Sequence, residues 1–206
     1  MPLTFPLPLA TFWDRLKVTS VQWAPMRGKN LAERGDGEIL TSARGTALWR
    51  GTATLADAYH ADAAEIEALL SLLDLGGSSA SFLAYDPRKP SLAAGGTGSA
   101  TLGSISTDRR EISLDGFTGG ITPGDLFAFT YGSNPTRYAL HRAVTGASNS
   151  EAFEVVPPIR MGAALGTPVT YEKPAAKFIL APEPSYGSGR PLITAGASFS
   201  LLQTLR

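Results

Sequence analysis

The chain has no cysteine, only two histidines and no net charge, and each shortage excludes a class of function. Without cysteine it can form no disulfide, no thiolate metal site and no cysteine nucleophile. Its 18 Lys and Arg residues balance 18 Asp and Glu residues, so no overall field attracts nucleic acid or an acidic membrane surface. We therefore expect no nucleic-acid partner.

Long apolar runs are missing as well. No window approaches the roughly 18 consecutive apolar residues that a membrane-spanning helix needs. The N-terminal segment 1–17 lacks a basic start, and prolines interrupt its apolar residues, unlike those of a signal peptide. The sequence predicts a soluble protein without a membrane span, made in the cytoplasm.

The two histidines, His60 and His141, lie far apart in the sequence. A metal site would need both of them and a carboxylate, and no helical spacing brings them together. A serine hydrolase would need a GxSxG elbow, which is absent. We interpret both as surface or edge histidines, and we expect no catalytic residue, metal or cofactor.

An acidic group surrounds the start of a predicted helix. Two facing carboxylates would suit a glycosidase, but acidic residues at a helix N-terminus are also favoured by the helix dipole and by solvation. We favour the second explanation for this group, which consists of Asp57, Asp62, Glu65 and Glu67.

Glycine and proline are abundant, at 22 and 15 residues, and they separate short alternating segments that are typical of strands joined by turns. A break in the apolar alternation near Thr19–Ser20 predicts a bulge. The last strand could pair back with the first domain. The predicted strands are 15–23, 38–56, 81–85, 100–106, 111–114, 126–131, 137–144, 153–156, 169–171, 176–181 and 198–205.

One segment has helical periodicity, with apolar residues at i, i+3, i+4 and i+7. Asp62 is the predicted N-cap, and Gly76–Gly77 are the predicted C-terminal stop. The stripe consists of Ile66, Leu69, Leu70 and Leu73.

The candidate interface residues lie near the N-terminus. Trp23 and Trp49 alternate with polar residues on strands and are expected in the core. Trp13 lies in a proline-rich arm, so we expect it to plug into a neighbouring subunit. The polar segment 26–36 is predicted to be an exposed loop or hairpin tip. The interface candidates are Trp13, Arg27, Lys29, Asn30 and Arg34.

The domain organisation follows from a small-residue linker at 91–98. Five closely spaced strands come after it. We predict an all-β protein with one packed α-helix. Residues 1–90 plus 166–206 would form a β-sandwich or barrel core that carries the helix, and 91–165 an inserted small β-barrel-like module.

The order of these elements resembles the small tail proteins of long-tailed bacteriophages, and it is similar to the distal tail protein group. The motifs are WRGTATL at 49–55, AEIEALLSLLD at 64–74, SFLAYDPRKP at 81–90, ITPGDLFAFTY at 121–131 and FEVVPPIR at 153–160. The resemblance implies a structural virion protein at the tail tip, made in the host cytoplasm. It also implies a homo-hexameric ring that joins the tail tube protein to the hub protein of the baseplate, with the inserted module outside.

Three alternatives remain. The first is another tail role, such as a tube or hub subunit. The second is a carbohydrate-binding module that recognises the host through its β insert. The third, a hydrolase, would require activity that depends on His60 or His141.

Overall fold

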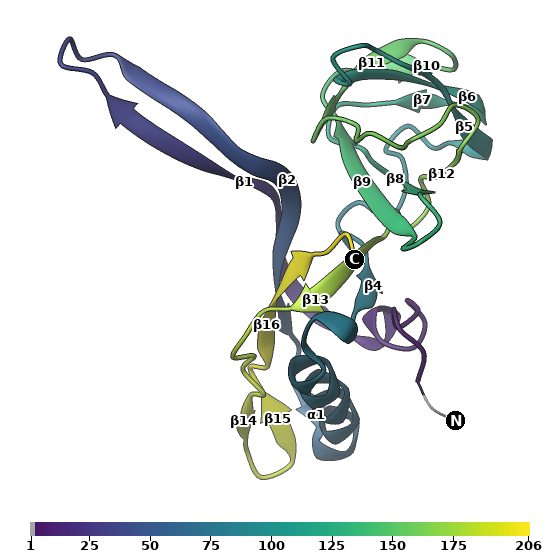
Figure 1. Cartoon of the computed structure of the whole chain (residues 1–206). Helices are drawn as coiled ribbons and strands as arrows, with labels where there is room; N and C mark the ends of the chain where they lie inside the picture. Colours follow the sequence, from purple (N-terminus) through teal and green to yellow (C-terminus); the bar gives the residue numbers. More distant parts are fainter. Residues whose placement is uncertain (1–2) are drawn as a thin grey trace.

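The computed structural model describes residues 3–206, apart from the side chains at positions 43, 44 and 78. Within this range a single α-helix, α1 (His60–Leu75), lies among many strands, so the predicted all-β class with one packed helix is confirmed. The strands form two bodies (Figure 1). One is a five-stranded sheet with a covering layer, here called the core, and the other is a closed barrel.

The core sheet is antiparallel and follows the order β1–β2–β16–β13–β4. A register shift between Val18 and Ser20 confirms the predicted bulge. The last strand pairs with β2, as predicted. The five strands are β1 (Val18–Glu33), β2 (Ile39–Leu55), β4 (Phe82–Ala84), β13 (Ala176–Leu180) and β16 (Ser198–Gln203).

A second layer covers one face of this sheet. It is built from the N-terminal segment and α1, whose apolar side chains join the same buried cluster as those of the sheet. A small three-stranded sheet lies beside the helix. The further elements of this layer are the 3-10 turns η1 (Trp13–Arg15) and η2 (Gly77–Ser79) and the strands β3 (Ala58–Tyr59), β14 (Ser188–Gly189) and β15 (Ile193–Ala195).

The helix buries the predicted stripe. Leu70 and Leu73 are fully covered, and Ile66 and Leu69 pack against the cluster from its edge. The predicted N-cap is wrong, because α1 begins at His60 and Tyr59 occupies the cap position without a side-chain hydrogen bond. The carboxylate of Asp62 lies in the first turn instead, where the helix dipole favours it.

The barrel is closed in the order β11–β6–β5–β12–β8–β9. Five of its strands correspond to those predicted within 91–165. The sixth, β12, lies in the range 166–206 that was expected in the core, but it pairs with β5 and β8, where it closes the barrel. The strands are β5 (Thr97–Ile105), β6 (Glu111–Thr118), β8 (Leu126–Tyr131), β9 (Arg137–Ala143), β11 (Ala152–Val156) and β12 (Pro168–Thr170), with a ribbon of β7 (Gly120–Ile121) and β10 (Ala147–Ser148) beside them.

The barrel is inserted between two neighbouring strands of the core sheet. β4 and β13 pair directly, with Ala84 opposite Ala176. The chain therefore leaves the sheet and returns to it at adjacent points.

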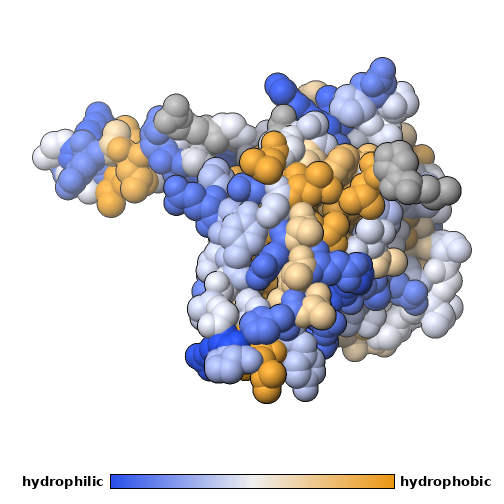
Figure 2. Space-filling view, turned by 90° about the horizontal axis from the view of Figure 1, so that it is seen from below, coloured by the Kyte–Doolittle hydropathy of each residue, from blue (hydrophilic) through white to orange (hydrophobic). Residues whose placement is uncertain are grey.

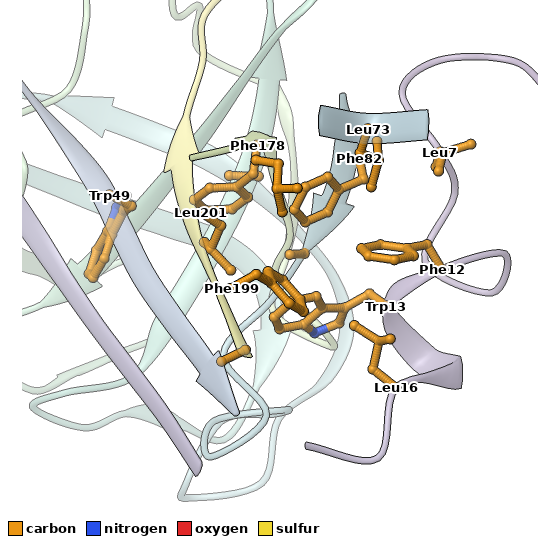
Figure 3. Packing of buried hydrophobic residues seen from close by; sticks show 14 of the residues in the cluster. Leu7, Phe12, Trp13, Leu16, Trp49, Leu73, Phe82, Phe178, Phe199 and Leu201 are labelled. Atoms are coloured by element: carbon orange, nitrogen blue, oxygen red, sulfur yellow. The ribbon is translucent and has the colours of Figure 1, made fainter. Parts of the chain in front are cut away.

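The three tryptophans all lie in the core. Trp23 and Trp49 are buried, as predicted. Trp13 is also only 3% exposed, and it packs on Phe82 with ring centroids 6.3 Å apart (Figure 3). The interpretation of Trp13 as a plug for a neighbouring subunit is wrong, because its own chain already covers the indole.

The packing of Trp13 predicts a loss of stability on truncation. Trp13→Ala should lower the free energy of unfolding by about 3–5 kcal/mol, since it removes a large side chain from a packed aromatic cluster. Denaturant unfolding of the purified chain measures this change. The control is Leu3→Ala, at an exposed apolar position of the same segment, which should change little. Equal stability of Trp13→Ala and the parent would contradict the burial.

Candidate interface

The most distinctive surface feature is a long two-stranded arm. Beyond Met26, β1 continues to Glu33 and pairs only with β2, which begins at Ile39 (Figure 1). The predicted loop at 26–36 is thus mostly strand, and only residues 34–38 form the turn. A hydrogen bond from the Arg34 N–H to the Glu38 carbonyl closes that turn.

Apolar side chains are exposed on the arm. Leu31, Ile39 and Leu40 are 71%, 65% and 50% exposed. Figure 2 shows hydrophobic groups among the hydrophilic ones on the projecting arm. Exposed apolar side chains at the end of a thin projection make the arm a candidate contact surface.

The exposed apolar residues of the arm lie on both of its faces. Residues that pair across an antiparallel ladder lie on the same face. Leu31 therefore shares a face with Thr41, and Ile39 shares this face opposite Glu33. The other face carries the uncharged pairs Ala32–Leu40 and Asn30–Ser42. Burying these four residues would require no charge to be desolvated.

The structure places four of the five predicted interface residues on the arm. Lys29 and Asn30 are exposed there. The other two also have local roles: Arg27 donates through Nε to the Gly45 carbonyl at 3.2 Å, and Arg34 lies near two carboxylates of the turn. Trp13 is separate, in the core.

Leu31, Ile39 and Leu40 are not among the interface residues predicted from the sequence. They could have been found in the sequence as large apolar residues that lie within or directly after the polar segment 26–36.

The acidic group lies at the start of α1 and is largely solvated. Glu65 accepts a hydrogen bond from Arg15 of the N-terminal segment, and this bond together with the positive charge lowers the pKa of Glu65. Lys17 lies 4.0 Å from Asp62. These contacts join the helix to the segment before β1.

A cleft of about 740 Å³ lies where the barrel meets the core. Most of its lining is apolar, and the polar groups come from Ser91, Thr130, Tyr138, Thr170, Glu172 and Lys173. The ammonium of Lys173 is held by Asp14 at 2.9 Å and lies 5.5 Å from the Tyr85 ring centroid.

The two histidines have different environments. His60 is exposed, as predicted, and its ring contacts Thr194 and the Arg190 carbonyl. The prediction for His141 is wrong, because this residue is 3% exposed inside the barrel, stacked against Phe127 and Phe129. Across the described residues, no group of three or more His, Asp and Glu side chains is placed to hold a metal ion.

Burial fixes the protonation of His141. Its Nδ1 lies 2.7 Å from the Pro157 carbonyl, so Nδ1 carries the hydrogen and donates it. Nε2 has no partner among the described atoms. Burial in apolar surroundings lowers the pKa of His141 to about 4.

Comparisons with known proteins give no family for this chain: it matches no protein-family model and no curated protein sequence. In the part of the chain that the structure describes, no helix is both long and apolar enough to cross a membrane.

His141 predicts a loss of stability in acid. The pKa of a histidine in an unfolded chain is near 6.5. Between about pH 6.5 and pH 4 the unfolded state therefore binds a proton at this residue and the folded state does not. The free energy of unfolding should therefore decrease by about 3 kcal/mol as the pH is lowered from 6.5 to 4.

The measurement is denaturant unfolding at several pH values. His141→Asn keeps an N–H donor for Pro157 but cannot titrate, so its stability should depend less on pH than that of the parent in this window. The control is His60→Asn at the exposed histidine, which leaves His141 in place. Parallel pH curves for His141→Asn and the parent would refute the assignment.

Proposed function

We propose that the chain is a structural virion protein of a bacteriophage tail tip, which assembles with copies of itself into a ring between the tail tube and the baseplate hub. The observation that supports this proposal best is the arm, with its exposed Leu31, Ile39 and Leu40. The resemblance of the sequence motifs to distal tail proteins supports the same function.

The arm is suited to bridging subunits. Its strands leave the core sheet and pair only with each other beyond Met26, so both outer edges carry backbone groups open to a partner. A head-to-tail contact between one subunit's arm and its neighbour's body closes into a ring when the rotation is right. In such a ring the core would build the wall, with tube and hub proteins on its two ends and the barrel outside.

The arm also limits the alternatives. A tube or hub subunit could use the same kind of contact, so these roles remain variants of one structural function. Carbohydrate binding is favoured by a different observation, the cleft in which the aromatic ring of Tyr138 lies beside the hydroxyl groups of Thr130 and Thr170. Glycan-array binding by the full chain, lost in Tyr138→Ala, would favour that function.

Assembly can be tested directly. The purified chain should show a mass several times that of the monomer by light scattering at high concentration, and rings by negative-stain imaging. Monomers at every concentration would contradict self-assembly.

The arm residues give the sharper test. Leu31→Ser, Ile39→Ser and Leu40→Ser together should shift the mass toward the monomer, since burying one such side chain contributes about 1.5–3 kcal/mol, or roughly tenfold or more in affinity. The matched control is Leu192→Ser, an exposed leucine outside the arm. If the triple arm variant and Leu192→Ser shifted the mass equally, the arm would not be the interface.

A further inference from the structure

The arm changes direction at an irregularity in its ladder. Met26 pairs with Leu48 and Gly28 pairs with position 44, so one residue of β1 stands opposite three residues of β2. Gly45 has a φ of +65° there, which glycine adopts without strain. Such bulges bend a hairpin and increase its twist, and Figure 1 shows the bend where the arm leaves the core.

Two arginines bind carbonyl groups of the bulge. Arg27, on the arm itself, binds the carbonyl of Gly45. Arg160, which follows the barrel strand β11, donates through Nη2 to the carbonyl of Ala47 at 3.2 Å. Residues 45–47 have no partner on β1, so these side chains supply hydrogen bonds at the place where the β1–β2 ladder is interrupted.

Trp49, two residues closer to the core on β2, is also hydrogen-bonded to the barrel. Trp49 is fully buried, and its Nε1–H donates to the Leu140 carbonyl of β9 at 2.7 Å. The guanidinium of Arg142, also on β9, lies 4.9 Å from the Trp49 ring centroid. Gln203 links the same places, since it accepts from the Trp49 N–H and donates to the Tyr138 carbonyl.

Arg160 is itself held in place. Its backbone carbonyl accepts a hydrogen bond from Nη1 of Arg109 at 2.9 Å, and the neighbouring Ile159 N–H donates to the Arg109 carbonyl at 2.8 Å. The contact with Ala47 therefore comes from a fixed part of the barrel rather than from a free loop.

We propose that the inserted barrel braces the arm, with Arg160 and Trp49 as the positioning residues that fix the direction in which the hairpin leaves the core. The barrel contacts β2 at Ala47, within the bulge, and at Trp49, on the core side of it, so a hairpin that could pivot on its bulge is held at one angle.

The consequence for assembly rests on the proposed function. In a ring, the angle between arm and body sets the rotation from one subunit to the next, and thereby whether the ring closes. The barrel would then help to set the geometry of the ring by fixing the angle of the arm.

The absence of cysteine from the chain allows clean spin labelling. Labels at Thr41→Cys on the arm and Ala68→Cys on α1, diluted with unlabelled chain, report the distance between arm and core within one molecule by pulsed electron paramagnetic resonance. The parent should give one narrow distance peak. Arg160→Ala should lose that single peak and give a broad distribution. Trp49→Phe, which keeps an aromatic ring but lacks the indole N–H, should broaden it too.

The control is Arg110→Ala, an exposed arginine of the barrel whose side chain lies outside this junction, and it should keep the narrow peak. Circular dichroism checks that each variant is folded, and if one variant fails to fold, the other carries the test. A narrow peak at the parent distance in a folded Arg160→Ala or Trp49→Phe would overturn the brace. The distance is measured within single chains, so this outcome is separate from whether the protein forms rings.

Discussion

The structure depends on the pairing of the last strand with the second. β16 lies between β2 and β13, so the sheet is complete only when the end of the chain has returned to a strand formed near its beginning. Phe199 and Leu201 of β16 belong to the same buried hydrophobic cluster as Trp49 and Phe178 (Figure 3). The helix and the barrel lie between β2 and β16 in the sequence. The pairing of these two strands is slow to form, because a large loop must close first.

The two halves of β2 have different environments. The inner half of β2 pairs with both β1 and β16, and Trp49 and Ala53 face the core, whereas its outer half pairs only with β1 and is exposed. A two-stranded hairpin alone is marginally stable in water. The outer half therefore gains its order from the ladder, from the arginine contacts at its bend and, under the proposed function, from a neighbouring subunit.

Sequence patterns predicted most elements that bury one face, and failed where no single face is buried. The helix stripe and strands such as 126–131 were predicted because their apolar residues recur at regular spacing. In the arm, the prediction of a strand at 38–56 agrees with β2. The outer part of β1 lies within the predicted loop or hairpin tip at 26–36, because a strand exposed on both faces has no such pattern. The prediction of a surface or edge histidine at His141 fails because the closed barrel buries both sides of a strand whose sequence alternates with polar residues. The contact of Arg160 with Ala47 joins residues more than a hundred positions apart, and periodicity carries no information about it.

The adjacency of Ala84 and Ala176 has a consequence for how this chain can change. In topological terms, β4 and β13 are a hairpin whose connecting loop has grown into a whole domain. The ends of that domain sit one ladder spacing apart, so its size has little effect on the entropy of forming the sheet. Such a position accepts a short turn or a different domain with similar ease. A module exchanged at this position would have to replace Leu126, Ala128 and Leu140 of the barrel in the buried cluster of the core, and each exchange would alter how the arm is held.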